Sequence, residues 1–346
     1  MVSYVRTGAI ALHAGRALDA PRRSCQRRGM DALLGLALDP ACTPPAVDTL
    51  AAWWDVTAAA RDRRATPFDR AFAGGVYADR LGFAFAAGYA AALHALVPSL
   101  APGTIAALCA TEDGGNHPRA IHTQLVAREP GHATLTGRKK WASIATAASS
   151  LLVVASTGVV DGQNRLRVVR VRSDAAGVRL SPSSAPFVPE IPHAEVELDG
   201  VDVADADILP GDGYDDYLKP FRTVEDLHVH GALAGYLIGL ARRKRFPREL
   251  QERLLVLALA TRALAAADPK AATTHTALAG VLDLAHRLVA ELEPLWAASP
   301  DDEWTRWQRD RPLLRVAGTA RAARRERAWA TLDAAQHHSP KDVPCD

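Results

Sequence analysis

The sequence predicts an α+β protein in which a region of β-strands lies between two helical regions. In the middle of the chain, short apolar or alternating runs are separated by turn residues, a pattern typical of strands. On both sides of this region, apolar residues recur every three or four positions over longer stretches, as packed helices require. We therefore expect an N-terminal helical domain at 30–104, a middle β domain built as a barrel or sheet at 105–213, a C-terminal four-helix bundle at 214–336 and a tail at 337–346.

Length and composition indicate a globular protein with several packed layers. The chain has 346 residues, of which 48% are hydrophobic and 23% charged, and its net charge is only +2. A near-neutral chain has no strong general attraction to nucleic acid or to an anionic membrane, and no apolar run approaches the roughly 20 residues that a membrane helix needs. The four cysteines form no C-x-x-C pair and have no zinc-like histidine spacing, which predicts no metal site and a reducing compartment, the cytoplasm.

The first 29 residues differ from the rest of the chain. They are rich in arginine and contain a single acidic residue, Asp19. This composition is typical of a disordered tail, which we favour, or of a leader-like extension. A cleaner helical pattern opens at Met30, which we expect to begin the folded protein.

The N-terminal domain is expected to contain three helices. Apolar residues at helical spacing predict helices at 30–38 and 47–64, separated by a proline-containing break. The stretch 68–97 after Pro67 is rich in alanine and apolar on most sides, with aromatic residues such as Tyr89 at intervals. We expect it to form one helix, buried in a bundle.

The middle domain is expected to contain seven strands. A loop opens at 113–116, where aspartate and glycine residues force a turn after the first strand. A second turn, around Pro130 and Gly131, joins two strands in a hairpin and brings Trp141 back beside the Thr111 loop. The predicted strands lie at 106–111, 121–128, 133–139, 151–155, 165–172, 178–180 and 194–198.

Two motifs in this domain resemble the flavin-binding segment of the acyl-CoA dehydrogenase family. They are T-E-D-G-G at 111–115 and L-T-G-R-K-K-W-A-S at 135–143. The family has a T-E-x-x-A-G-S loop and a G-x-K-x-W-[IA]-[TS] strand at these places. The resemblance extends over roughly residues 45–332, and it implies an α-β-α architecture with FAD as the cofactor.

The resemblance also implies roles for individual residues. Thr111 matches the loop threonine that faces the flavin ring, Trp141 the tryptophan that packs on the ring, and Ser143 the hydroxyl that reaches its N5 edge. Two positions differ from the family, because His117 stands where a serine is usual and Leu108 where an aromatic residue is common.

Glu225 is the candidate catalytic base. Four helices are predicted in the C-terminal domain, at 217–245, 248–267, 273–297 and 311–335, and Glu225 lies at the margin of the apolar stripe on the first. Partial burial there can raise a carboxylate pKa toward neutrality, which suits a base. In the subclass of the family that includes the isovaleryl and long-chain enzymes, the base lies on this helix. The alternative is a solvated ion pair between Glu225 and Arg222.

A second segment bears on the position of the base. The sequence R-D-R-P-L-L-R-V-A-G-T at 309–319 resembles the family segment that ends in A-G-T when the base is on the earlier helix. By this resemblance Gly318 and Thr319 form a turn near the flavin. The alternative is that 311–335 is one uninterrupted helix with Gly318 inside it, at a cost of about 1 kcal/mol.

Fewer residues match those with which the family holds the adenine and pyrophosphate half of FAD. R-R-K-R-F-P at 242–247 stands in place of the family's R-x-Q-F-G region, so Arg242 is the candidate phosphate ligand. A solvated helix end is the alternative for this run of charges. The family's Q-x-x-G-G turn is absent, and the C-terminal domain looks shortened, which indicates a divergent member.

The function implied by the resemblance is FAD-dependent α,β-dehydrogenation of an acyl thioester such as an acyl-CoA. A homodimer or homotetramer is expected, because family members complete the cofactor site across a subunit interface. Two alternatives stay open: a degenerate member that serves as a binding or scaffold protein, and a flavin oxidase or monooxygenase on the same fold. The acyl group and the electron acceptor are not indicated.

Overall fold

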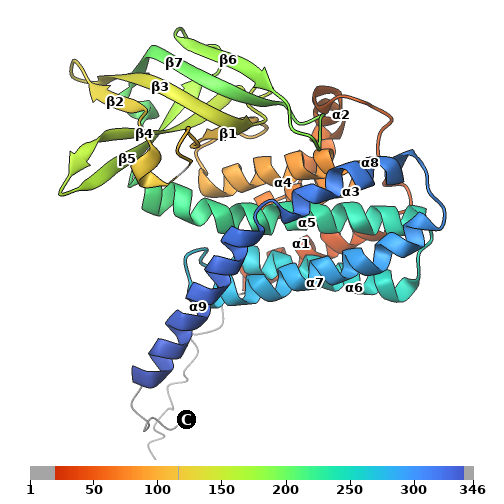
Figure 1. Cartoon of the computed structure of the whole chain (residues 1–346). Coiled ribbons are helices and arrows are strands. Elements are labelled where there is room, and N and C mark those ends of the chain that lie inside the picture. Colours follow the sequence, from red (N-terminus) through yellow and green to blue (C-terminus); the bar gives the residue numbers. More distant parts are fainter. Residues whose placement is uncertain (1–19, 116, 339–346) are drawn as a thin grey trace, which may run out of the picture.

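The computed structural model describes residues 20–115 and 117–338, and side chains between residues 29 and 336 apart from residue 116. A curled β-sheet lies against one side of a layered helical region (Figure 1). The α+β class and the helix, strand, helix order are therefore as predicted. Within the described residues no helix is both long and apolar enough to cross a membrane.

The N-terminal region contains α1 (Ala20–Leu38), α2 (Leu50–Asp62), α3 (Pro67–Val76) and α4 (Leu81–Leu96). Helix α1 begins ten residues before Met30, so the helix reaches into the segment that we predicted as an extension. Residues 1–19, the rest of that segment, lie outside the described part of the chain.

The prediction of one helix at 68–97 is wrong, because this stretch forms two helices. The backbone at Arg80 is extended, with φ −152° and ψ 154°, which ends α3 and starts α4 in a new direction. A single helix of that length would span about 45 Å and leave much of its apolar surface without partners. Instead α3 and α4 pack on each other, so closely that a Cβ added at Gly74 would lie 2.3 Å from the Cβ of Ala87.

All seven predicted strands are present and form one sheet. Its order is β1-β4-β2-β3-β7-β6, with β5 paired to the free side of β4. Strand β4 runs parallel to β1 and β2, and the other pairs are antiparallel. The strands are β1 (Ala106–Cys109), β2 (Gln124–Ala127), β3 (His132–Ser143), β4 (Ser150–Val160), β5 (Gln163–Arg172), β6 (Val178–Ser183) and β7 (His193–Ala204).

The C-terminal region contains the four predicted helices and one short helix that the sequence pattern missed. A π-helical turn (Gly213–Leu218) leads into α5, and the unpredicted α8 is followed by a 3-10 turn (Arg311–Arg315). The chain therefore breaks before Gly318, and the alternative of one helix over 311–335 is wrong. The helices are α5 (Lys219–Arg243), α6 (Arg248–Ala265), α7 (Ala272–Ala297), α8 (Asp302–Asp310) and α9 (Gly318–His338).

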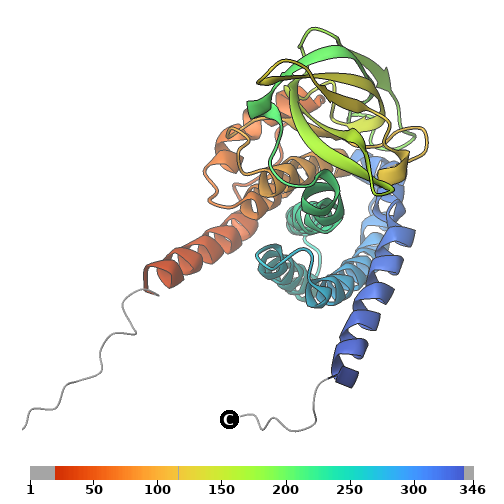
Figure 2. The same ribbon diagram turned by 90° about the vertical axis from the view of Figure 1, so that its left-hand side faces the viewer.

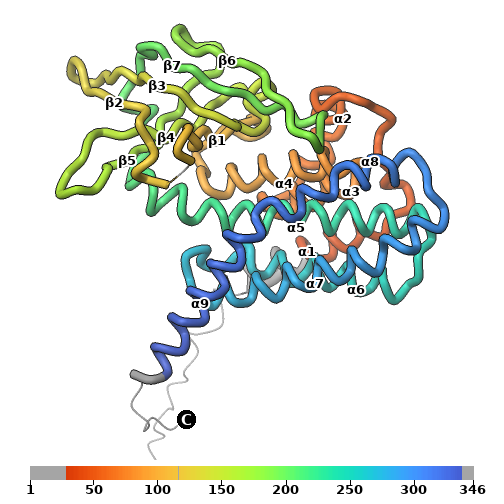
Figure 3. Tube along the Cα trace, viewed as in Figure 1, coloured from red at the N-terminus to blue at the C-terminus, as the bar shows by residue number. Residues whose placement is uncertain are grey.

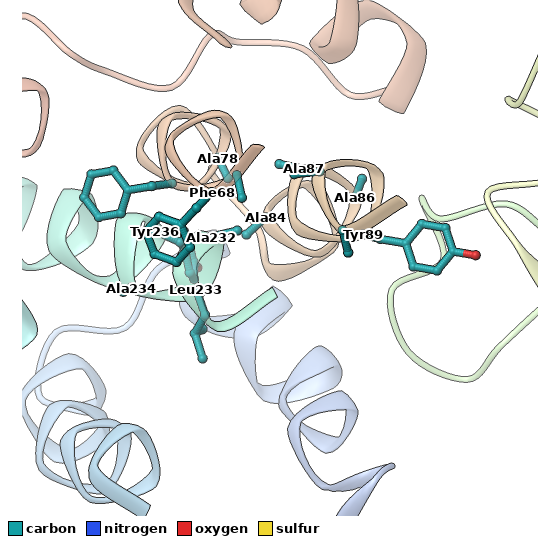
Figure 4. Close-up of a cluster of buried hydrophobic side chains, with 14 of the residues drawn as sticks. Phe68, Ala78, Ala84, Ala86, Ala87, Tyr89, Ala232, Leu233, Ala234 and Tyr236 are labelled. Carbon is teal, nitrogen blue, oxygen red and sulfur yellow. The ribbon is translucent and has the colours of Figure 1, made fainter. Parts of the chain in front are cut away.

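Helix α5 is the centre of the helical region. It runs through the middle of the layer, with α3 and α4 on one side and α6 and α7 on the other (Figure 3). Figure 4 shows Ala232 and Tyr236 of α5 among side chains of α3 and α4. Gly75 of α3 lies so close to α5 that an added Cβ would be 1.9 Å from the carbonyl oxygen of Ala232. Contact at backbone distance fixes where α5 lies, and with it every side chain that α5 presents.

Gly75→Ala tests this contact. The new methyl group has to push two backbones apart, so we expect the free energy of unfolding to fall by about 1–3 kcal/mol or more. Gly280→Ala is the matched control, because it is also a helix-interior glycine but has no atom within 4 Å of an added Cβ. There the substitution should stabilise by up to about 1 kcal/mol through helix propensity. Chemical denaturation of both variants measures the difference, and equal stabilities would contradict the packing described.

Candidate active site

A cavity of about 1010 Å³ opens where the sheet meets the helices. Its walls come from α4, β1 and the loop after it, β3, the start of α5, the start of α7 and the first turns of α9. Figure 2 shows α9 running down from beneath the sheet along one side of the molecule. The volume is at the upper end of the range for small-molecule sites, so it has room for a tricyclic ring and a second molecule.

Four of the six residues selected from the sequence line this one cavity: Thr111, Trp141, Ser143 and Glu225. The first three come from the β domain and Glu225 from α5, so residues far apart in the sequence line one cavity. His117, which stands where a serine was expected, also lines the cavity.

The remaining two residues do not line the cavity. Thr319 is exposed on α9, between the lining residues Ala317 and Ala320. Arg242 lies about 25 Å along α5 from Glu225, given a rise of 1.5 Å per residue. Its guanidinium donates to the carbonyl oxygen of Ala37 at 2.9 Å.

The charges that follow Arg242 are also used within the chain. Arg243 pairs with Glu303 of α8 at 2.8 Å, and Lys244 pairs with Asp301. The structure therefore does not bring this run of cations to the cavity. A role for Arg242 with a cofactor phosphate stays a prediction.

A buried ion pair between Glu112 and Lys139 joins the two sequence motifs. Lys139 is fully buried, and its Nζ lies 2.5 Å from Oε1 of Glu112. The carboxylate also accepts hydrogen bonds from the backbone N–H groups of His122 and Thr123, at 2.8 and 3.0 Å, and from the Thr123 hydroxyl at 2.8 Å. Although burial alone favours the neutral acid, Lys139 and these N–H groups hold the pKa of Glu112 below its ordinary value.

The two motifs contain both residues, but their pattern alone does not predict that the residues pair. Glu112 follows Thr111 in the loop, and Lys139 is the lysine of the G-x-K-x-W pattern. The pair holds the loop after β1 against β3. Lys140 strengthens the join, because its backbone N–H donates to the carbonyl oxygen of Thr111 at 2.8 Å.

Trp141 lies on a bulge that turns its indole into the cavity. The pairing of β3 with β7 shifts register between Lys139 and Ala142, which leaves Trp141 outside the ladder. Its φ is +56°, a left-handed conformation that costs a residue other than glycine about 1–3 kcal/mol. The indole is 59% exposed. A strained backbone that presents a large apolar ring to an open cavity is typical of a binding wall.

Ser143 lies two residues beyond Trp141 on the same wall. Its hydroxyl lies 3.3 Å from Nδ1 of His193, at the start of β7. Burial lowers the pKa of His193, so the neutral ring can hold the serine hydroxyl in place. Ser143 is thereby oriented at the edge of the cavity.

Glu225 is half-buried on the helical wall of the cavity. Burial raises its pKa to about 7, with a further contribution from the neighbouring charge of Asp226. The positive charges of Arg321 and Arg222 oppose this shift without reversing it. Within the described residues the Glu225 carboxylate forms neither a hydrogen bond nor an ion pair, so its oxygens are available to a ligand.

The neighbouring Asp226 has a different role, because it fastens α9 to α5. Its carboxylate lies 2.6 Å from Arg321 and 2.6 Å from Arg324, both on α9. Although burial opposes ionisation, Arg321 and Arg324 hold the pKa of Asp226 below its ordinary value. Two adjacent acids on one helix therefore have pKa values shifted in opposite directions by their surroundings.

The histidines of α5 are structural. Nδ1 of His228 donates to the carbonyl oxygen of Val224, and Nδ1 of His230 to that of Asp226, each at 2.7 Å. Burial lowers the pKa of both rings to about 4, so both are neutral near pH 7. Within the described residues no group of three or more His, Cys, Asp or Glu side chains is arranged to hold a metal ion.

One part of the cavity is lined by basic side chains. Lys219 and Lys270 line it and pair with Asp215 and Asp216, at 3.4 and 3.0 Å. Arg327 of α9 also lines it, and its guanidinium forms no ion pair within the part of the chain that the structure describes. Anionic ligand groups such as phosphates would be favoured beside these residues.

The helices, curled sheet and cavity together define an acyl-CoA dehydrogenase-like fold, as the motifs predicted. Butyryl-CoA dehydrogenase from Megasphaera elsdenii matches with a TM-score of 0.65 at 11% identity, over 88% of this chain and 98% of that chain. FMN-bound TdsC from Paenibacillus sp. A11-2 matches with 0.64 at 17%, over 91% and 99%. The prolyl acyl carrier protein oxidase AnaB matches with 0.62 at 14%, over 89% and 99%.

These identities are low, so the likeness concerns the fold. Neither the protein-family models nor the curated proteins gave a match to the sequence.

Lys139→Met tests the buried pair. The substitution leaves Glu112 buried without its cation, which typically costs about 3–5 kcal/mol of folding free energy. Lys140→Met is the matched control, because the neighbouring lysine pairs with Asp113, whose side chain is 80% exposed. Loss of that pair should cost about 1 kcal/mol or less. Unfolding in urea measures both variants, and an equal effect of the two substitutions would show that the buried pair is not the stronger constraint.

Proposed function

We propose that the protein is a FAD-dependent oxidoreductase that removes hydrogen from the α and β carbons of an acyl thioester. The observation that supports this most directly is that Trp141 of the β domain and Glu225 of α5 line the same cavity, which the protein's own side chains do not fill. A cytoplasmic homodimer or homotetramer is part of the proposal, as the resemblance of the two sequence motifs implies.

The residues on the β wall fit an isoalloxazine ring. The exposed indole of Trp141 offers a flat surface for stacking, and the Ser143 hydroxyl and the Thr111 loop offer polar groups beside it. When bound, the flavin would supply the acceptor for the hydride that leaves the β carbon. The cationic part of the cavity, which includes Arg327, would hold the phosphates of the nucleotide or of the substrate.

Glu225 is proposed to remove the α proton. A base works best when its pKa lies near the working pH, and burial raises the pKa of Glu225 to about 7. Leu108 and Phe221 add apolar surface beside it, which limits water around the carboxylate. Asp226 is ruled out as the base, because both of its oxygens are held by arginines.

Oxygen chemistry is the second candidate. It is supported by the likeness to the prolyl acyl carrier protein oxidase AnaB. The same Trp141 wall would serve both reactions, and the nature of the electron acceptor separates them. The scaffold alternative is less well supported, because it gives no role to the cavity carboxylate of Glu225, whose pKa burial raises to about 7.

Trp141→Ala tests the flavin wall. The protein is titrated with FAD and, in parallel, with FMN, and binding is measured from the change in visible absorption. We expect a dissociation constant for at least one of the two flavins. Loss of the stacking surface should weaken that binding about tenfold or more, equivalent to about 1.4 kcal/mol. Trp329→Ala is the control, because this α9 tryptophan is also exposed, at 46%, but does not line the cavity. Absence of binding by either flavin to the wild-type protein would refute the proposal.

Glu225→Gln tests the base. Anaerobic reduction of the flavin by an acyl-CoA panel, measured by stopped flow, should be slowed about 10²- to 10⁴-fold, whereas exposed Glu252→Gln should have no effect. The wild-type rate should rise with pH and reach half its maximum near pH 7, because only the carboxylate accepts a proton. An undiminished rate in Glu225→Gln would remove the base from the mechanism.

The same variant has a defined effect on stability. The folded-state pKa of Glu225 lies above the ordinary 4.5, so ionisation destabilises the fold. This cost is absent below about pH 4.5 and grows until the pH has passed about 7. Glu225→Gln should therefore melt no earlier than the wild-type protein at pH 8, and a lower melting temperature there would indicate that the carboxylate has a structural partner.

A further inference from the structure

Tyr89 is a polar side chain of the cavity that the proposed mechanism does not use. It lies on α4 and is only 3% exposed, yet it is among the residues that line the cavity. Figure 4 shows its ring pointing away from α4 and from the labelled side chains of the helical core. The hydroxyl reaches β1, where it accepts a hydrogen bond from the backbone N–H of Leu108 at 3.0 Å.

The hydroxyl has one hydrogen to donate. Its oxygen is held as an acceptor by Leu108, so the hydrogen has to point elsewhere. Within the described residues no acceptor takes it. Burial raises the pKa of Tyr89 far above its ordinary value, so the phenol keeps its proton near neutral pH. A buried donor without an acceptor is costly, which favours a ligand as its partner.

Tyr89 lies close to the candidate base. Its ring meets Phe221 of α5 edge to face, with centroids 5.9 Å apart and planes at 87°. Phe221 and Glu225 are four residues apart, so they lie one above the other on the same face of α5. The donor on α4 and the base on α5 therefore belong to the same wall of the cavity.

We propose that the Tyr89 hydroxyl donates a hydrogen bond to the carbonyl oxygen of the substrate, beside the carbon from which Glu225 takes a proton. This inference rests on the proposed function. When the α C–H bond breaks, the proton goes to Glu225 and the electron pair spreads onto the carbonyl oxygen. A fixed donor at that oxygen stabilises the developing charge without itself losing a proton. Tyr89 is therefore a substrate-binding residue that selects ligands with an acceptor oxygen at this position.

Tyr89→Phe removes the donor and keeps the ring. The flavin-loaded protein is titrated with an acyl-CoA and with the matching alkyl-CoA thioether, in which CH₂ replaces the carbonyl group. The wild-type protein should prefer the thioester, and Tyr89→Phe should weaken thioester binding about three- to tenfold, the range for one hydrogen bond, while thioether binding stays unchanged. The rate of flavin reduction should fall, with its half-maximum still near pH 7.

Two further variants serve as controls for this test. Tyr217→Phe is the matched control, because its hydroxyl donates to the carbonyl oxygen of Pro210 at 2.8 Å and does not line the cavity. It should leave both affinities unchanged. Incorporation of 3-fluorotyrosine at position 89 retains both hydrogen bonds and gives a stronger donor, so the preference for the thioester should be kept or increased.

The outcomes separate this inference from the proposed function. Equal affinity of the wild-type protein for thioester and thioether, or an unchanged preference in Tyr89→Phe, overturns the role of Tyr89 as donor. Thioesters that bind with the predicted preference but never reduce the flavin overturn the dehydrogenation and support the donor.

Discussion

The site depends on the buried ion pair between Glu112 and Lys139. Separating the two charges would leave each of them buried without a partner, which costs several kcal/mol of folding free energy. The pair therefore fixes the position of the loop after β1 relative to strand β3. In that position Thr111 lies beside the bulge, where Trp141 has a left-handed backbone conformation and lines the cavity. The strain at Trp141 persists because Lys139 anchors the strand two residues earlier.

A second constraint places the helical wall. Gly75 and Gly88 let α3 and α4 approach α5 at backbone distance, which leaves little freedom for α5 to rotate or slide. Glu225 therefore faces the cavity, and the adjacent Asp226 turns toward α9. Packing thus decides which of two neighbouring acids is the base candidate, and the arginines of α9 make the choice electrostatic as well as geometric.

The sequence predicted what local patterns encode. Strand alternation located all seven strands, and the two motifs placed Trp141 beside the Thr111 loop, where the backbone N–H of Lys140 donates to the carbonyl oxygen of Thr111. Contacts between distant segments were missed: Asp226 meets its arginines across 95 and 98 residues. The α3–α4 break was missed because alanine-rich periodicity continues through it. Helix α8 was missed because it is short and mostly polar, although Trp307 within it is buried.

A crystal structure of the protein grown with FAD tests the central claim most directly. That claim is that the Glu112–Lys139 pair and the α5 contacts hold two walls apart at a spacing that admits a flavin ring. The account predicts an isoalloxazine stacked on Trp141, with Glu225 across the cavity and the ion pair intact. A cavity closed by the protein's own side chains, or a flavin bound away from Trp141, would contradict it.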